Sequence, residues 1–440
     1  MRATTRGAIA ATLVCVVTVA GAPAGARETT WSPAETHGPA SGATHVDVLA
    51  PRIVTDAAGT DTLAWLESVP ESGGQQLVVS RRPAGGAWSD PDPIGSTRDN
   101  WDPALAAGPD GEALAVWVHV RRDVSGSMVG TSVLASSFDG AAWSEPETLW
   151  QGKAWAFHPS PAVDASGRAV LAWSRGGAHP AQLAAVRTPE GVWSDPTRLD
   201  ATGSVFVATV GAGIDDRGKA TVAWSDEGRL WARRWNGTAW VTARRLAASQ
   251  PAEATLAVAS DGTAAAAFIT GKPARVAVRT MTRSGTWGAA TVADDRAGPA
   301  DSALALAPRA DGWGVAWTRS DRIRVREVVA GVWRRPRSAW ASPDGTPWGV
   351  QLAYDGAGEP VVLWLSPVPG PGPATKVLAI GRTGTGWPAD PTSVSGDRSR
   401  LTGLRLASAS DGRLTAAWTK ALGARDRAVT ATGAAPAPPP

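Results

Sequence analysis

A tryptophan that follows a turn glycine recurs roughly every 50 residues, and this repeat constrains the fold more than any other feature of the sequence. Most copies read Gly-x-Trp or a close variant of it. The tryptophans of this series are Trp31, Trp88, Trp143, Trp193, Trp240, Trp287, Trp333 and Trp387. Internal repeats of this length are typical of solenoids and propellers, in which every repeat is one small unit of secondary structure.

A second aromatic series lies in short runs of Ala, Val and Leu, which have the composition of buried β-strands. Its members are Trp65, Trp117, Trp173, Trp224, Phe268, Trp317, Trp364 and Trp418. The two series together contain fifteen of the 23 tryptophans. We interpret both series as core residues that pack between neighbouring units.

The segment from Pro103 to Leu149 shows how one unit is built. A short extended run ends at Asp110-Gly111, and an Asp/Gly turn recurs at this place in every unit. Asp-Gly between extended runs indicates a hairpin, because glycine accepts the positive φ of a tight turn. Each unit thus reads strand, Asp/Gly turn, strand, variable loop, strand, Gly turn, strand. This order predicts a four-stranded antiparallel blade.

The two chain ends contain complementary parts of one further unit. The unit that starts at Leu404 provides three strands and stops, whereas the segment around Trp31 has only the signature of a fourth strand. If the ends share a blade, the ring closes and no sheet edge stays open. We therefore predict an all-β, eight-bladed β-propeller of four-stranded antiparallel blades. The alternative, seven blades, would leave one fragment unpaired.

Both termini also extend beyond the repeats. Arg2 and Arg6 begin the chain, an apolar run follows, and Ala24-Gly25-Ala26 has the small residues of a cleavage site. Residues 1–26 are therefore predicted to be a secretory signal peptide, and the mature protein to be secreted. We assign residues 27–431 to the propeller and the Ala/Pro-rich residues 432–440 to a disordered tail. The only cysteine, Cys15, lies in the signal peptide, so we expect no disulfide.

Charge and composition narrow the range of partners. The chain has 43 Lys and Arg against 40 Asp and Glu, and two of the arginines lie in the signal peptide. Because no run of basic residues suits a phosphate backbone, nucleic acid is disfavoured as a partner. No membrane span is expected after signal cleavage. The five histidines lack metal-ligand spacing, so we expect no metal and no cofactor, and we expect a monomer.

The layout resembles the Asp-box repeat propellers, a group that includes bacterial sialidases. In those repeats a polar turn and a glycine precede a tryptophan that starts the outermost strand, as in Ser137-Phe138-Asp139-Gly140-Ala141-Ala142-Trp143. Arg52-Ile53, which opens the first full blade, looks like the Arg-Ile-Pro start of sialidases, although position 54 is Val. The resemblance implies a propeller fold and a role for Arg52 in binding a carboxylate.

The catalytic residues of sialidases are not matched. The only tyrosine, Tyr354, directly precedes the Asp355-Gly356 turn, on the face opposite the variable loops. The second and third arginines of the sialidase triad have no counterpart by motif, and sialidase folds have six blades. We therefore assign no catalytic residue, since a shared fold does not imply a shared activity.

Eight tryptophans belong to neither series, and five of these lie in connections from a fourth strand to the next unit. Those connections share a face with the variable loops, where function usually resides. An aromatic ring beside planar polar groups is what a sugar or peptide site uses, because the ring stacks and the polar groups orient the ligand. The predicted ligand-binding residues are Trp101, Trp155, Trp348, Arg98, Asp102 and His158. The alternative is that these tryptophans only seal the ends of the inner strands.

The sequence thus predicts a secreted, non-catalytic propeller that binds a glycan or an extracellular protein on the variable-loop face. One alternative is a sialidase-like or other glycoside hydrolase, with a carboxylate pair drawn from Asp99, Asp102 and Asp123. Another is a structural repeat protein without a small-molecule site.

Overall fold

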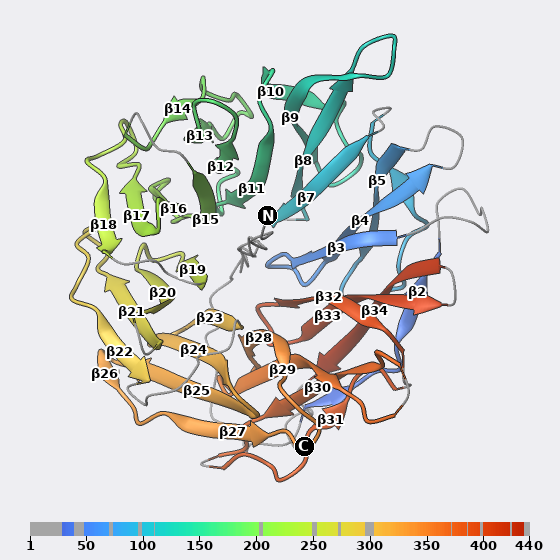
Figure 1. Cartoon of the computed structure of the whole chain (residues 1–440), viewed down its shortest axis with the longest axis vertical. Coiled ribbons are helices and arrows are strands. Elements are labelled where there is room, and N and C mark those ends of the chain that lie inside the picture. Colours follow the sequence, from blue (N-terminus) through green and yellow to red (C-terminus); the bar gives the residue numbers. More distant parts are fainter. Residues whose placement is uncertain are drawn as a thin grey trace, which may run out of the picture.

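Eight antiparallel sheets form a closed ring, as the computed structural model of the chain shows (Figure 1). The structure describes residues 29–38, 48–69, 74–95, 99–109, 111–201, 206–248, 253–271, 274–294, 303–370, 372–384, 386–396, 399–422 and 425–434. The predicted signal peptide and the last six residues lie outside this part of the chain. The prediction of an eight-bladed propeller is confirmed.

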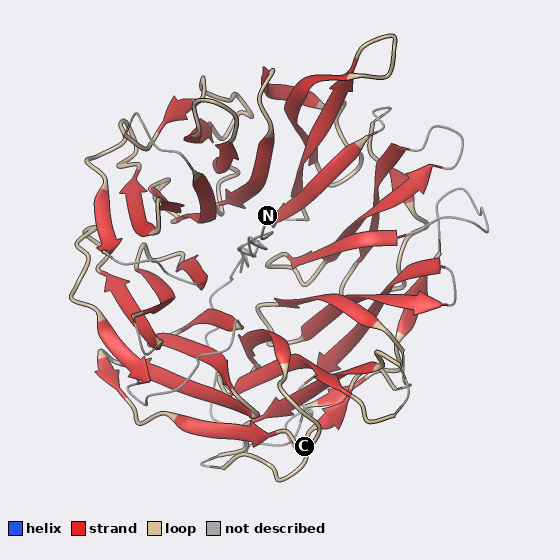
Figure 2. Ribbon diagram, viewed as in Figure 1, coloured by secondary structure: helices blue, strands red, loops and turns tan. Residues whose placement is uncertain are grey.

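Each blade runs in chain order from the centre of the ring outwards. The first three blades are β3 (Val48–Thr55), β4 (Asp61–Val69), β5 (Gly74–Arg82) and β6 (Asp92–Pro93); β7 (Asn100–Ala107), β8 (Ala113–Arg122), β9 (Met128–Phe138) and β10 (Glu147–Gly152); and β11 (Ala156–Val163), β12 (Ala169–Arg175), β13 (Ala181–Arg187) and β14 (Thr197–Arg198). The next two are β15 (Val207–Ile214), β16 (Ala220–Asp226), β17 (Arg229–Arg234) and β18 (Arg244–Ala247); and β19 (Glu253–Val258), β20 (Ala264–Thr270), β21 (Arg275–Met281) and β22 (Thr291–Asp294). Then come β23 (Leu304–Arg309), β24 (Gly312–Arg319), β25 (Arg322–Val329), β26 (Val332–Trp333) and β27 (Arg337–Ala341); and β28 (Trp348–Tyr354), β29 (Pro360–Pro367), β30 (Thr375–Gly381) and β31 (Thr392–Ser393). Strands and loops make up the described chain, and no described helix is long and apolar enough to cross a membrane (Figure 2).

The last blade joins the two ends of the chain. It contains β32 (Leu401–Ser408), β33 (Leu414–Leu422) and β34 (Arg425–Ala434), and both N-terminal strands, β1 (Thr30–Trp31) and β2 (Glu35–His37), pair with β34. The predicted sharing of one blade is therefore confirmed. Strand β34 continues three residues beyond position 431, where we expected the propeller to end, because Gly433 pairs with Leu414 on one side and with Trp31 on the other.

The core lies between the blades and is built by the second aromatic series. The tryptophans at the centres of the second strands have at most 1% of their surface exposed. The Gly-x-Trp series also packs between neighbouring blades, as expected, although most of its members are only half-buried. Trp143, for example, packs against a cluster that contains Leu77 of one blade and Trp117 of the next, and its ring centroid lies 5.5 Å from that of Phe138.

The Asp/Gly turns are closed by their own aspartates. In the turn between β11 and β12, Asp164 Oδ1 accepts hydrogen bonds from the backbone N–H groups of Ser166 and Arg168, at 2.8 and 3.0 Å. Asp215 and Asp355 bond their turns in the same way. Because these carboxylates satisfy local backbone donors, the recurrence of Asp has a structural explanation.

Candidate functional site

The inner strands of most blades bulge at the same register position. The pairing of the inner with the second strand shifts there in six of the blades. In five of them a residue at the bulge has a positive φ; these residues are Ala50, Asp102, His158, Gly349 and Gly403. A positive φ is strained for residues other than glycine, and such strain gathers at functional sites. Because the non-glycine residues with positive φ lie on β3, β7 and β11, these three inner strands are the candidates for a functional site.

The bulge lies close to the variable-loop face of the ring. Asn100, at the start of β7, pairs with His119 near the end of β8, from which the variable loop to β9 departs. On β3, β7 and β11 the residue with positive φ is followed by a proline, at positions 51, 103 and 159. Proline has no N–H to donate, so it interrupts the ladder at that point. The three bulges thus bring Ala50, Asp102 and His158 to equivalent places on consecutive blades.

A cavity of about 80 Å³ lies among the inner strands at this level. Two arginines, Arg52 on β3 and Arg405 on β32, line it, and each comes two residues after the positive-φ residue of its own strand. Asp102 and His158 line the same cavity from β7 and β11. We call these four residues, together with Trp101 and Trp155, the channel site.

Asp102 links three blades. Its Oδ2 accepts a hydrogen bond from the backbone N–H of His158 at 2.6 Å, and its Oδ1 lies 3.9 Å from Arg52 Nη2. Arg405 Nη1 donates to the carbonyl of Leu404 at 2.8 Å, and no carboxylate of the described chain lies within ion-pair distance of Arg405. The cavity therefore contains two guanidinium groups and one carboxylate.

Burial controls the electrostatics of the channel site. It lowers the pKa of Arg52, and Asp102 acts in the opposite direction. Burial also lowers the pKa of Arg405, and the neighbouring Arg52 lowers it further. Both guanidinium groups nevertheless stay charged at neutral pH. Burial lowers the pKa of His158 as well, which keeps its imidazole neutral, so the net charge of the cavity is positive.

The structure brings most of the predicted ligand-binding residues together. The rings of Trp101 and Trp155 meet edge to face with centroids 5.5 Å apart, and Trp155 has 45% of its surface exposed. Trp101 directly precedes Asp102 in the chain, but neither ring of this pair lines the cavity. Trp348, with 38% of its surface exposed, begins β28 and does not line the cavity. Arg98 lies outside the described residues.

Sequence reasoning missed Arg405 and reached Arg52 only through the resemblance to sialidases. The Ala50-Pro51, Asp102-Pro103 and His158-Pro159 dipeptides are the signal that was available, because they mark one register position in three consecutive units. Arg405 has no such dipeptide before it. Its place beside Arg52 depends on the closing of the ring, which brings the last inner strand next to the first.

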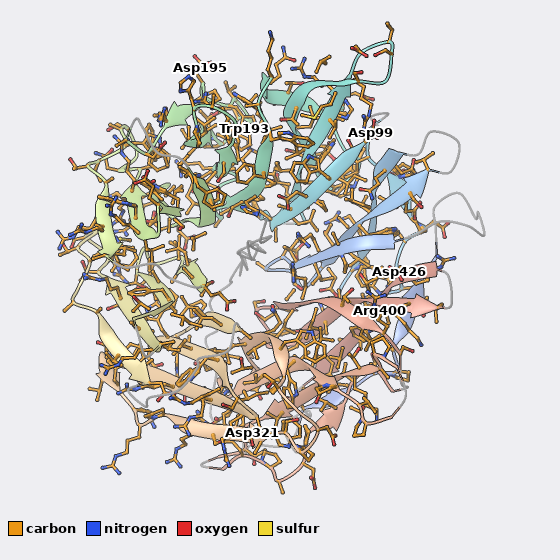
Figure 3. All side chains as sticks on the ribbon, in the orientation of Figure 1. Asp99, Trp193, Asp195, Asp321, Arg400 and Asp426 are labelled. Carbon is orange, nitrogen blue, oxygen red and sulfur yellow. The ribbon has the colours of Figure 1, made fainter. Side chains whose placement is uncertain are left out.

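The other two acids proposed for a glycosidase pair are engaged elsewhere. Asp99, labelled in Figure 3, accepts a hydrogen bond from Arg122 Nε at 2.7 Å. Asp123 closes its own turn by accepting from the backbone N–H of Ser127 at 3.0 Å. Neither lines the cavity. In the described part of the chain no three His, Cys, Asp or Glu residues are grouped to hold a metal ion.

Comparisons with known proteins find distant structural matches and no match in sequence. No protein-family model matches the chain, and no curated protein matches it. A protein of unknown function from Dyadobacter fermentans matches with 12% identity and a TM-score of 0.44, over 93% of this chain and 99% of its own. Polysaccharide lyase Uly1 matches with 11% identity and a TM-score of 0.46, over 89% of this chain and 90% of its own. The intramolecular trans-sialidase from Ruminococcus gnavus matches with 13% identity and a TM-score of 0.38, over 84% of this chain and 89% of its own. At this distance the likeness concerns the propeller architecture alone.

Proposed function

We propose that this protein is a secreted, non-catalytic propeller that binds a carboxylate-bearing glycan at the channel site. The observation that carries the proposal is the pair of half-buried guanidinium groups of Arg52 and Arg405, which line one cavity together with a single described carboxylate, that of Asp102. Guanidinium groups in a low-dielectric cavity bind carboxylates through strong, charge-assisted hydrogen bonds. An anionic ligand would neutralise the charge that Asp102 leaves uncompensated.

The size of the cavity limits what enters it. A volume of about 80 Å³ has room for a few water molecules or one small charged group, and small-molecule pockets of about 300 Å³ or more are needed to enclose a whole ligand. The carboxylate therefore enters the cavity and the rest of the ligand lies over its rim. Trp155, three residues before His158 in the chain, is exposed and offers a flat apolar face on which we expect a sugar ring to stack.

The alternative of glycoside hydrolysis has less support. That chemistry requires two carboxyl groups on either side of the scissile bond. Among the described residues that line the cavity, Asp102 is the only acid, and its Oδ2 already accepts a hydrogen bond from the backbone N–H of His158. An extracellular protein partner stays an alternative that the glycan experiment distinguishes.

The proposal is tested by titrating the full chain with a glucuronate-containing oligosaccharide and with its neutral glucose counterpart. We expect binding of the acidic ligand only, and a loss of about tenfold or more in Arg405→Gln, because a hydrogen bond to a charged group contributes about 1.5–3 kcal/mol. Arg322→Gln is the matched control, since Arg322 has 53% of its side chain exposed, pairs with Asp321 and does not line the cavity. Equal affinity for the neutral ligand, or unchanged binding by Arg405→Gln, would overturn the proposal.

A further inference from the structure

Three consecutive blades carry an arginine at the same position of the third strand. Each arginine pairs with the residue that lies two positions before the core aromatic of the second strand; the three are Arg233, Arg279 and Arg326. Each guanidinium donates to the backbone carbonyl of the residue after the Gly-x-Trp tryptophan of its own blade, at 2.6 to 2.8 Å. The three guanidinium groups therefore occupy equivalent places near the outer edge of the ring.

Two of the three arginines also bond to the preceding blade. Arg233 Nη1 donates to the carbonyl of Leu199 at 3.2 Å. Arg326 Nη1 donates in the same way to the carbonyl of Val292 at 2.6 Å. In the described structure Arg279 makes only the bond within its own blade, and its buried Nε has no hydrogen-bond partner. Arg279 thus keeps donors free at its boundary with the preceding blade.

The outermost strand of the preceding blade explains this difference. At the two bridged boundaries that strand has a threonine four residues after its Gly-x-Trp tryptophan, and these threonines are Thr197 and Thr291. At the boundary that Arg279 faces, the same position is Arg244. Because two guanidinium groups repel each other, Arg244 disfavours the close approach that the other two arginines make.

Arg244 and Arg279 face the same boundary, between the blade of β15–β18 and the blade of β19–β22. The apolar cluster at this boundary contains Ala232, which pairs with Arg244, and also Ala277 and Met281, which lie two residues to either side of Arg279. Side chains two residues apart in a strand share a face, as do directly paired ones. Burial lowers the pKa of Arg279, and the charge of Arg244 lowers it further. No carboxylate of the described chain lies within ion-pair distance of either residue, and we call the two residues the arginine pair.

The outer rim of the ring has opposite charges on opposite sides (Figure 1). The blade of β23–β27 has Arg337 at the position of Arg244, and the three consecutive blades on the other side of the ring have acids there, namely Glu35, Asp92 and Glu147. All five side chains are exposed. Charges of one sign gathered on one side raise the local concentration of ions of the other sign. Anions are therefore attracted to the side of the ring that holds the arginine pair.

We infer that the arginine pair binds a phosphate group, either the free ion or a monoester on a larger molecule. Two cations without a carboxylate are neutralised by one dianion, and a phosphate group carries about −1.5 to −2 charges at pH 7. Guanidinium groups hold such an anion through several charge-assisted hydrogen bonds at once. This site lies at the outer edge of the ring and does not depend on the channel site, so the two proposals fail separately.

The experiment uses variants whose new residues already occur at equivalent positions of the repeat. Arg244→Thr introduces the threonine of the two bridged boundaries. Arg279→Ser introduces the residue at the equivalent position of the β7–β10 blade, Ser136, whose Oγ donates to the carbonyl that follows its own tryptophan at 2.7 Å. Both variants should therefore fold. Arg337→Thr is the matched control, because it removes the same charge at a boundary where the counterpart of Arg279 is the apolar Ile380.

Inorganic phosphate, glucose 6-phosphate and the singly charged glucose 6-sulfate are titrated by calorimetry at constant ionic strength and about pH 8, where a phosphate monoester is fully ionised. We expect at least one of the two phosphate compounds to bind the wild type, Arg337→Thr and Arg405→Gln alike. Arg244→Thr and Arg279→Ser should bind it about tenfold or more weakly, because each lacks one charged donor. Tighter binding of glucose 6-phosphate would assign the site to phosphate esters, and tighter binding of inorganic phosphate would assign it to the free ion.

Three results overturn the inference. They are equal binding by Arg244→Thr and Arg337→Thr, binding of glucose 6-sulfate as tight as that of the phosphate compounds, and no binding of either phosphate compound to the wild type at millimolar concentration. Binding that is lost in Arg405→Gln and kept in Arg244→Thr places the anion in the channel site, which also overturns it.

Discussion

At the scale of single residues, the fold keeps a carboxyl group in its neutral form at Glu253. Its Oε1 accepts the backbone N–H of Leu304 at 3.3 Å, and its buried Oε2 has no hydrogen-bond partner in the described structure. Burial raises the pKa of this carboxyl to about 8, against which the single hydrogen bond from Leu304 has little effect. A buried acid of this kind makes the stability of the protein sensitive to alkaline pH.

The sign of this dependence follows from proton binding. Between pH 4.5, the ordinary pKa of the group, and about 8, folded Glu253 holds a proton that the unfolded chain releases, so the free energy of unfolding falls as pH rises through this range. Glu253→Gln removes the ionisation and keeps the acceptor. We expect urea unfolding to show this variant ~2–4 kcal/mol more stable than the wild type at about pH 9 and nearly equal at about pH 4. A constant difference at both pH values would contradict the assignment.

At the scale of elements, the short strand β2 holds the ring closed through a buried histidine. His37 Nε2 is 2.9 Å from Thr430 Oγ1 on β34, and its ring lies 5.0 Å from that of Trp88 and 6.0 Å from that of Trp65. Burial lowers the pKa of His37 to about 4, and the charge of Arg82 acts in the same direction. Protonation therefore opposes the docking of β2.

The pairing of β2 with β34 should therefore be less stable in acid. Folded His37 stays neutral down to about pH 4, whereas the unfolded chain takes up the proton below pH 6.5, so stability falls as pH drops from 6.5 to about 4. The loss is ~3 kcal/mol at most. Thermal unfolding at about pH 7 and pH 4.5 should show a drop for the wild type that is smaller in His37→Gln. Parallel curves for the two proteins would exclude His37 as the cause.

The elements also show where prediction from sequence succeeds. The strands, the Asp/Gly turns and the variable loops can be predicted from the sequence, because each follows from a pattern within one repeat of about 50 residues. The bulges are not, because one extra residue in an inner strand scarcely disturbs a run of small apolar side chains. The channel site depends on these bulges. Asp102 and His158 could be predicted from the sequence because they lie close to tryptophans in the connecting segments. Arg405 could not, because it reaches the site only through the packing of β32 against β3.

At the scale of the whole molecule, β1 and β2 close the ring by pairing along the outer edge of β34. Without β1 and β2, the outer side of β34 would present unpaired backbone groups. A chain that starts after residue 38 should therefore lose several degrees of melting temperature and associate through this edge. Size-exclusion chromatography with light scattering, alongside calorimetric melting, measures both effects. A monomer with wild-type stability would show that β33 and β34 need no partner.

The shared blade also sets the order in which the protein can be completed. The ribosome synthesises Trp31 long before Gly433, yet the two residues pair with each other in neighbouring strands. Nearly the whole chain must be present before this pairing forms, and contacts so distant in sequence are slow to form. Trp31 is thus synthesised early but reaches its native pairing late. A chain that is truncated before β34 cannot form this pairing, so its ring stays open.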